Sequence, residues 1–168
     1  MGWINTRKDL SKSRKRIRIL FDSGCEATLV NGNFLTHLKK KKVKNTTWTT
    51  KAGSFVTKEK CDITFTLPEF HEGKTIDWTV YVDSSDNEFS TYDMIIGRDM
   101  LKELGIDLIF SDLMMTWANA TVPMRNLSWF NENNIEAYEN EILSMHDPLT
   151  TEAERIQRIM EVKYAPAD

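Results

Sequence analysis

The chain has 168 residues and a formal net charge of −3, and 40% of its residues are hydrophobic. This composition suits one globular domain of modest size with appendages. No stretch is apolar over the length needed to span a bilayer, and no apolar signal region opens the chain, so we expect no membrane association and an intracellular, cytoplasmic location.

Basic residues concentrate toward the N-terminus. Residues 1–44 hold 12 Lys and Arg against 3 Asp and Glu, a local excess of +9, mostly in the runs Lys12–Arg18 and Lys39–Lys44. Such runs attract nucleic acid electrostatically, but more often they are solvated faces or flexible arms, and no aromatic RNA-binding motif accompanies these. We therefore expect residues 1–16 to form a basic N-terminal arm, with nucleic-acid binding as a side activity at most.

The first motif is a carboxylate in a turn. The apolar segment Ile17–Phe21 leads into the triplet Asp22-Ser23-Gly24, and apolar residues resume within 27–30. The Ser23 hydroxyl is able to hydrogen-bond neighbouring backbone, and Gly24 permits a positive φ or a close backbone approach that a Cβ would resist. Asp-Ser-Gly alone is a common turn sequence, so the flanking strands are what make this triplet a candidate positioning device for Asp22.

Three β segments are predicted before the second motif. Thr46–Thr57 has two β-prone runs around Gly53, which indicates a hairpin. Cys61–Leu67 and Ile76–Val82 alternate between apolar and polar residues, as half-buried strands do, and Pro68 ends the first of them.

The second motif is an apolar segment that ends at a glycine, Tyr92–Asp99, with the sequence Tyr-Asp-Met-Ile-Ile-Gly-Arg-Asp. Asp99–Leu104 then has a short helical pattern closed by Gly105 as the residue after the helix. Ile106–Phe110 and Leu113–Trp117 flank a Ser-Asp turn and predict a hairpin.

Beyond Met124 the pattern changes from β to helical. Ile135–Met145 carries apolar residues at helical spacing, and Thr151–Lys163 opens with the capping box Thr-Glu-Ala-Glu. We expect residues 125–168 to form a helical tail or linker.

Together, the triplet at Asp22 and the motif Tyr92–Asp99 resemble the two signatures of retroviral-type aspartic proteases, and most of all the protease region of a long-terminal-repeat retrotransposon polyprotein. The resemblance runs from about Ile17 to Met124. It implies an all-β, retropepsin-like acid protease barrel over residues 17–124 with one short helix after the second motif. The tail would then be connecting sequence toward a following polyprotein domain, and the chain a fragment or a decayed copy of a longer reading frame.

The resemblance also assigns the catalytic roles. It implies that Asp22 is the catalytic carboxylate, that Ser23 and Gly24 hold it, and that substrate pockets are lined by Leu20, Cys25 and Ile95. The family more usually has alanine at the position of Cys25, so we expect an altered pocket size with the chemistry retained.

Two further features follow from the family order. The predicted hairpin becomes a flap over the substrate, with its tip at Ala52, Gly53 and Ser54, although an ordinary surface hairpin fits the sequence nearly as well. Arg98 matches an arginine that pairs with an acid, here Glu26, within the same subunit. Such a pair orients both segments if it is buried and bidentate, and contributes almost nothing if both charges are solvated.

The resemblance implies a homodimer. The chain has a single Asp-Ser-Gly and is about half as long as a two-lobed aspartic protease, while Asp83-Ser84-Ser85 lacks the glycine and lies in a polar stretch. A two-fold interface would bring Asp22 of both subunits together, where like charges share one proton. We expect an aspartic endopeptidase that cleaves an extended polypeptide, its own polyprotein above all.

Other chemistry has little support. The two cysteines and three histidines show no metal-ligand spacing, so we expect no metal and no cofactor, and a Cys-His nucleophile at Cys25 is a remote alternative. The main rival is a catalytically silent retropepsin-like domain that serves as a dimerisation or nucleic-acid-binding module.

Overall fold

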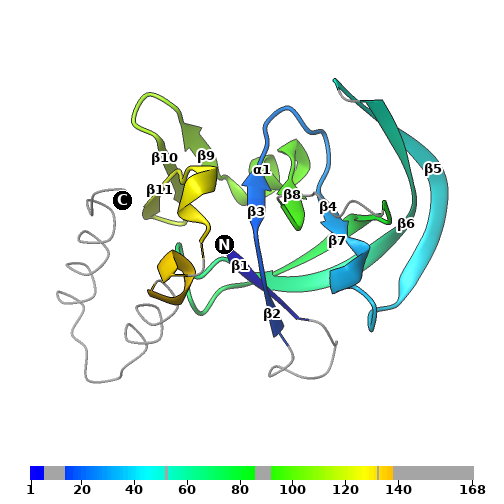
Figure 1. The fold of residues 1–168 in the computed structure, drawn as a ribbon, viewed down its shortest axis with the longest axis horizontal. Helices are drawn as coiled ribbons and strands as arrows, with labels where there is room; N and C mark the ends of the chain where they lie inside the picture. The colour runs from blue at the N-terminus through cyan, green and yellow to red at the C-terminus, as the bar shows by residue number, and fades with distance from the viewer. Residues whose placement is uncertain (6–13, 52, 86–91, 132, 138–168) are drawn as a thin grey trace. The chain divides into compact units, whose positions relative to one another are not determined.

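A computed structural model describes residues 1–5, 14–51, 53–85, 92–131 and 133–137 of the chain. It divides into two compact units, Met1–Asp107 and Leu108–Asp168. The first unit is built on one large sheet and the second on a small one (Figure 1). The prediction of an all-β fold with one short helix after the second motif is confirmed.

The large sheet contains eight strands in the order β2-β1-β6-β7-β4-β8-β3, with β5 paired to β6 off this path. The strands are β1 (Gly2–Asn5), β2 (Arg14–Ile17), β3 (Ile19–Phe21), β4 (Leu29–Asn31), β5 (Lys40–Thr50), β6 (Gly53–Thr66), β7 (Thr75–Asp83) and β8 (Met94–Ile96). A 3-10 turn, Gly32–Phe34, follows β4. The segment expected to be a basic arm thus contributes two strands, β1 and β2, that pair with each other and connect to β6.

The core of the first unit lies on one face of β6 and β7. Cys61, Ile63 and Phe65 of β6 are buried, and their polar neighbours alternate with them, as expected for a strand with one face on the core. On β7, Ile76 and Val80 are buried in the same alternation. The predicted strands Cys61–Leu67 and Ile76–Val82 are therefore confirmed, the first as the C-terminal part of a longer strand.

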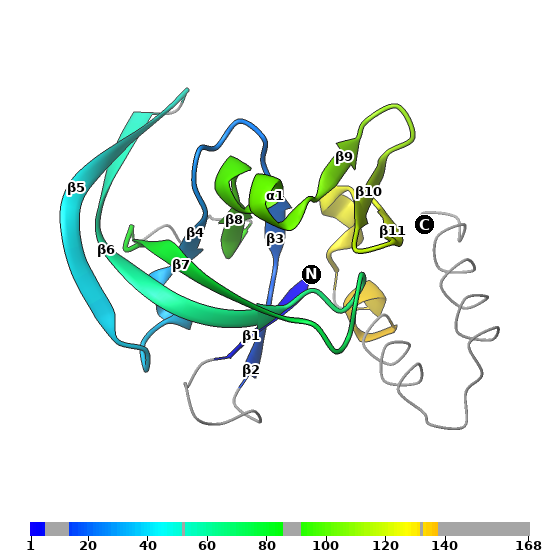
Figure 2. The same ribbon diagram turned by 180° about the vertical axis from the view of Figure 1, so that it is seen from behind.

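The predicted hairpin around Gly53 is confirmed and is longer than expected. Strands β5 and β6 pair from Thr50 and Gly53 at the tip to Lys40 and Cys61 at the base. The hairpin curls strongly, and its tip lies at the same end of the first unit as the β3–β4 connection in both views (Figures 1 and 2). The two segments expected to be flap and active-site turn thus lie toward one end of the unit.

Strand β8 lies between β3 and β4. It pairs in parallel with β3, where Leu20 is opposite Ile95, and antiparallel with β4, where Leu29 is opposite the same Ile95. The chain passes from β3 to β4 through the Asp22 turn. Strand β8 of the second motif therefore lies between the two strands that flank the first motif.

Helix α1 (Arg98–Leu104) directly follows β8 and is the predicted short helix. Gly105 has a φ of 72° and donates its N–H to the carbonyls of Leu101 and Lys102, which ends the helix as the sequence predicted. Met100 and Leu101 are its buried residues.

The second unit contains the three-stranded sheet β11-β10-β9, formed by β9 (Asp107–Ile109), β10 (Met114–Trp117) and β11 (Ala120–Pro123). The predicted β9–β10 hairpin is confirmed, but β11 was not predicted. Its turn uses Ala118 and Asn119 at φ values of 48° and 66°, a conformation that sequence usually signals with glycine. A 3-10 turn, Leu127–Trp129, and a helical segment at 133–137 follow, whereas most of the predicted tail helices lies outside the described residues.

Candidate active site

Asp22 lies at the end of β3 in a turn held at both sides. Its N–H donates to the carbonyl of Ile96 at 2.9 Å, and its carbonyl accepts from the N–H of Cys25 at 3.2 Å. Its carboxylate Oδ1 accepts a 2.8 Å hydrogen bond from the N–H of Gly24. The side chain is partly exposed, so the carboxylate is fixed by the backbone but remains accessible.

Gly24 is needed for space and not for a positive φ. Only Gly53 and Gly105 among the described glycines have a positive φ. A Cβ on Gly24 would lie 3.1 Å from Oδ1 of Asp22, which is tighter than an ordinary contact. Gly24 thus lies close to the Asp22 side chain and does not use a positive φ. Ser23 is exposed, and the Asp22 carboxylate accepts a hydrogen bond from the amide of Gly24 beside it.

Gly97 allows the second motif to touch the first. A Cβ at this position would lie 2.5 Å from the carbonyl oxygen of Ala27 and 2.8 Å from that of Cys25, so no side chain fits. The next residue, Arg98, donates its N–H to the Cys25 carbonyl at 2.8 Å. The two motifs, about seventy residues apart in sequence, are thus in backbone contact on both sides of Gly97.

The three residues assigned to pockets lie around this contact. Leu20 and Ile95 are half-buried register partners on β3 and β8. Cys25 is half-buried, and its Sγ donates to the Ala27 carbonyl at 3.1 Å. Burial raises the pKa of the Cys25 thiol, and the negative charge of Asp22 adds to this rise. The thiol therefore stays neutral and apolar beside the turn.

The expected pair between Glu26 and Arg98 forms, but it is exposed. One guanidinium nitrogen lies 3.4 Å from Oε1 of Glu26, and the side chains are 58% and 82% exposed for Arg98 and Glu26. A single contact between two solvated charges is worth little. It does not orient the two segments in the way a buried, bidentate pair would.

A different carboxylate joins the segments, and the sequence reasoning missed it. Oδ1 of Asp99 accepts from the Thr28 hydroxyl at 2.8 Å and from the Met100 N–H at 2.8 Å. Oδ2 accepts from the Thr28 N–H at 3.2 Å and from the indole N–H of Trp78 at 3.3 Å. The Thr28 hydroxyl, fully buried, accepts in turn from the N–H of Gly97 at 3.2 Å. The sequence shows only an acidic residue in the first turn of a short helix, a position where a negative charge commonly stabilises the helix N-terminus.

A second unpredicted pair fixes the beginnings of β3 and β8. Asp93 accepts from the Arg18 N–H at 2.8 Å, from Nε at 3.3 Å and from Nη2 at 3.2 Å. The Arg18 carbonyl accepts from the Asp93 N–H at 2.9 Å. The Asp93 side chain is only 14% exposed, so this forked pair is better sheltered than the pair between Glu26 and Arg98.

The hairpin expected to be a flap carries an aromatic cluster. Trp48 stacks on Phe55 with centroids 6.4 Å apart and meets Tyr81 of β7 edge-on at 5.1 Å. The Trp48 indole N–H donates to the hydroxyl of Thr57, which is fully buried. The hairpin is therefore tied to the sheet by side chains as well as by its strand pairing.

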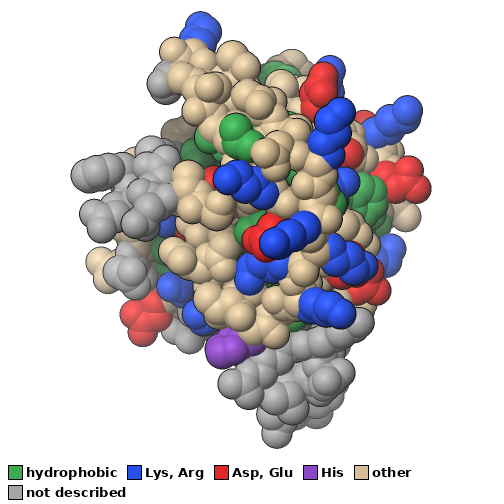
Figure 3. All heavy atoms as spheres, turned by 90° about the vertical axis from the view of Figure 1, so that its right-hand side faces the viewer, with side chains coloured by type: hydrophobic (Ala, Val, Ile, Leu, Met, Phe, Trp, Pro, Cys, Tyr) green, Lys and Arg blue, Asp and Glu red, His purple; other side chains and the backbone are tan. Residues whose placement is uncertain are grey.

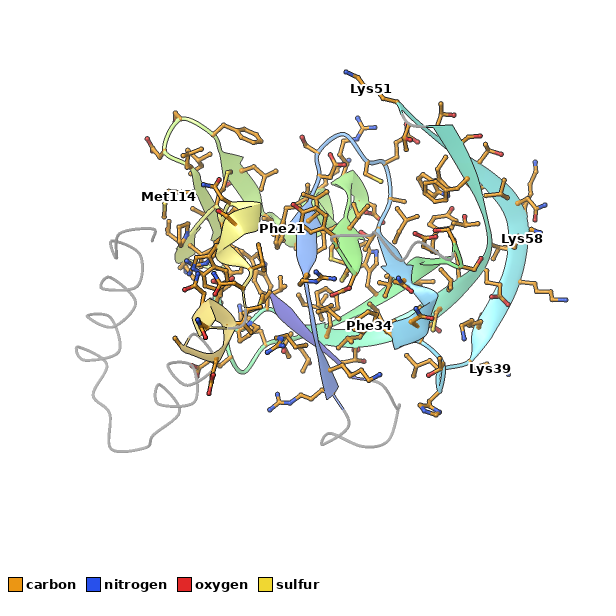
Figure 4. The ribbon with its side chains drawn as sticks, in the orientation of Figure 1. Phe21, Phe34, Lys39, Lys51, Lys58 and Met114 are labelled. Carbon is orange, nitrogen blue, oxygen red and sulfur yellow. The ribbon has the colours of Figure 1, made fainter. Side chains whose placement is uncertain are left out.

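The predicted tip residues lie where the hairpin turns. Gly53 and Ser54 are the first residues of β6, paired with Thr50 and Thr49, and both are exposed. Ala52 lies outside the described residues. The side chains of Lys39 and Lys51 mark the base and the tip of β5, and Lys58 points away from the sheet (Figure 4).

Most of the described basic residues of the two runs lie on edge strands, Arg14–Arg16 on β2 and Lys40–Lys44 on β5. Within the described part of the chain, β5 pairs only with β6, and β2 pairs only with β1. Lysine and arginine on an edge strand discourage pairing with another chain. Acidic side chains are interspersed with basic ones over the face beside β5 and β6 (Figure 3), and Lys41 pairs with Asp62 at 3.1 Å. Edge protection is therefore one structural role that these lysines can serve.

The described residues hold no group of three metal-ligating side chains. Both cysteines are free, and none of the helices described is long and apolar enough to cross a membrane.

The fold has counterparts among solved structures. It is similar to the crystal structure of the retroviral protease-like domain of Ddi1 from Leishmania major, with a TM-score of 0.47 and 17% identity over 78% of this chain and 95% of that one. It is also similar to EIAV protease complexed with the inhibitor HBY-793, with a TM-score of 0.40 and 20% identity over 61% of this chain and 97% of that one. No protein-family model matches the sequence, and neither does any curated protein. We therefore infer function from the site itself.

Proposed function

We propose that this chain is an aspartic endopeptidase that acts as a homodimer, with Asp22 of each subunit in a shared-proton dyad. One observation carries the proposal: the Asp22 turn is locked to the second motif through the carbonyl of Ile96, while the carboxylate is oriented by the Gly24 amide and stays accessible. A carboxylate that served only a structural role would be expected to accept bonds from a partner segment, as Asp93 and Asp99 do.

The chemistry requires two such carboxylates. Two acids about 3 Å apart cannot both ionise, so they hold one proton between them. The ionised member takes a proton from water as the water attacks the peptide carbonyl, and the protonated member donates a hydrogen bond to the carbonyl oxygen. Collapse of the tetrahedral species breaks the C–N bond, and the leaving nitrogen takes up a proton from the dyad.

The second carboxylate would come from a second copy of the chain. The sequence contains a single Asp-Ser-Gly, and an isologous two-fold interface places the same residue of each copy on the axis. Activity should therefore depend on protein concentration, and the monomer should be inactive.

The substrate would be an extended polypeptide. It would lie between the dyad and the hairpin tip at Gly53 and Ser54, adding a strand, and its alternate side chains would enter pockets near Leu20, Cys25 and Ile95. We further propose that the substrate is the polyprotein of a retrotransposon, with residues 17–124 as the protease domain and residues 125–168 as the link to the next domain.

Peptide cleavage by the wild type and by Asp22→Asn, measured from pH 4 to pH 7, tests the proposal. The asparagine keeps an oxygen for the Gly24 amide but cannot share a proton, so we expect turnover to fall by about a hundredfold or more. Asp83→Asn is the matched control, because Asp83 is the other aspartate followed by serine, and its carboxylate accepts hydrogen bonds from the amide and the hydroxyl of the nearby Ser85. It should cleave as the wild type does.

Two results would reject the proposal. Normal cleavage by a folded Asp22→Asn protein would remove Asp22 from the chemistry. No cleavage of a broad peptide library by a wild-type protein that sedimentation shows to be dimeric would leave a silent module of the same fold.

A further inference from the structure

We propose that Asp99 is a positioning residue for the catalytic turn, acting through Thr28 and Gly97; this rests on the proposed protease function. Asp99 is the second residue of α1. It collects hydrogen bonds from three elements: Trp78 of β7, the Thr28 segment before β4, and the first turn of α1. Four donors on one carboxylate exceed what a helix-capping side chain needs.

The connection from Asp99 to Asp22 passes through buried groups. The Thr28 hydroxyl has one proton, which it donates to Asp99, so its oxygen is free to accept the N–H of Gly97. Gly97 follows the carbonyl of Ile96, which holds the Asp22 amide, and precedes the Arg98 amide, which holds the Cys25 carbonyl. Fixing the peptide of Gly97 therefore fixes both ends of the Asp22–Cys25 turn.

The network requires a carboxylate and not merely a polar side chain. Each oxygen of Asp99 accepts two hydrogen bonds, so neither oxygen can be replaced by a hydrogen-bond donor without losing them. An asparagine in one orientation points its NH₂ at the N–H groups of Thr28 and Trp78. In the other orientation the NH₂ faces the N–H of Met100. In either orientation, the asparagine NH₂ group therefore faces an N–H donor and leaves it without an acceptor. This costs more than the loss of a single hydrogen bond.

Position 28 supplies a matched pair of variants. Thr28→Val keeps the shape of the fully buried side chain but removes the hydroxyl, so the Gly97 amide and Asp99 each lose a partner. Thr28→Ser keeps the hydroxyl and loses only a methyl group. If the residue merely fills the core, Val is the milder change; if it positions the turn, Ser is the milder change.

The activity readout separates kcat from KM. Small misplacements of a reacting group cost up to about a hundredfold in rate, so we expect Asp99→Asn and Thr28→Val to lower kcat by about 10- to 100-fold with little change in KM. Thr28→Ser should restore kcat. Val80→Ala is the control, because it creates a cavity at a fully buried residue of β7 and should lower only the stability of the fold. It should keep kcat per folded dimer.

The second readout needs no activity. Amide hydrogen exchange of Asp22 and Gly97, taken relative to the amides of β6, should quicken by about tenfold or more in Asp99→Asn and Thr28→Val and stay close to the wild type in Thr28→Ser. Unchanged exchange and kcat in Asp99→Asn would overturn the inference, and so would the order Ser worse than Val. If the wild type cleaves no peptide, the proposed protease function fails, while the exchange data still decide whether Asp99 holds the turn.

Discussion

The indole Nε1 of Trp48 lies 2.9 Å from the hydroxyl oxygen of Thr57 and donates a hydrogen bond to it diagonally across the β5–β6 hairpin. The acceptor is fully buried, whereas the tryptophan is half-buried between Phe55 and Tyr81. This bond fixes how the aromatic cluster lies against the sheet.

Thr57→Val should therefore lower the free energy of unfolding by about 1 kcal/mol, because the valine fills the same space and leaves the indole N–H without its acceptor. Chemical denaturation with Trp fluorescence measures the loss. Thr49→Val, at an exposed position of the same hairpin, is the control and should change stability little. Equal stability of the two variants would show that the bond contributes nothing.

Gly97→Ala should destabilise the fold strongly. The added Cβ would lie within 2.8 Å of three backbone atoms of Cys25 and Ala27, which cannot move aside as a flexible side chain does. Overpacking of this kind costs about 1–3 kcal/mol, so the thermal midpoint should fall by several degrees or the protein should not fold. Gly73→Ala meets nothing within 4 Å and should melt within experimental error of the wild type; equal midpoints for both variants would contradict the packing argument.

The two arginine–carboxylate pairs should differ in their contribution to stability. Asp93→Asn weakens three hydrogen bonds to Arg18 at a sheltered carboxylate, and we expect a loss of about 1–3 kcal/mol. Glu26→Gln affects one exposed contact with Arg98 and should change stability by less than about 0.5 kcal/mol. Urea unfolding at low and high salt measures both. A larger effect at Glu26 would reverse the ranking of these pairs.

The Cys25 thiol should react slowly at neutral pH. Burial, with the charge of Asp22, raises its pKa, and alkylation requires the thiolate. The folded state thus favours the protonated thiol: the resulting stability is present below the unfolded-chain pKa of about 8.5 and is lost as pH rises through the higher folded value. Iodoacetamide labelling followed by peptide mass spectrometry gives the rate of Cys25 separately from Cys61.

Asp22→Asn should shift the rate–pH curve of Cys25 to lower pH, because it removes a nearby negative charge. The pKa of Cys61 is also raised by burial, but the charges that act on it are those of Lys40, Asp62, Glu59 and Lys41, so its curve should not change. A curve for Cys25 that coincides with that of the denatured chain would show that the thiol is not desolvated.

The elements that sequence predicted well are those with strong local signals. The alternation of apolar and polar residues in β6 and β7 indicates one buried face on each strand. The glycine after α1 indicates a residue in the left-handed conformation. Strand β11 was missed because its turn has Ala118 and Asn119 in place of a glycine. β2, with the sequence Arg-Lys-Arg-Ile, was hidden by its basic residues, since an edge strand with charged side chains looks like a solvated arm in sequence. β1 has no charged residue and was missed because it is only four residues long.

The candidate site was predicted less completely than the fold. The roles of Asp22 and Gly97 are tied to motifs, and the structure places both where the chain segments meet. The network around Asp99 depends on which side chains face each other across three elements, and Trp78 stands 21 residues from it in sequence. Sequence instead favoured the pair of Glu26 and Arg98, which turned out to be solvated.

Strand β6 runs without interruption for 14 residues from the hairpin tip into the centre of the sheet. Strand β7 pairs with β6 only from Lys60 onward, and the register between β5 and β6 shifts between Lys42 and Thr46, opposite Lys58. A bulge bends a strand locally and increases its twist. In the proposed protease, opening of the tip would therefore be a bend of the hairpin at this bulge of β5, opposite Lys58. A change that stiffens the bulge should then slow substrate capture and product release together.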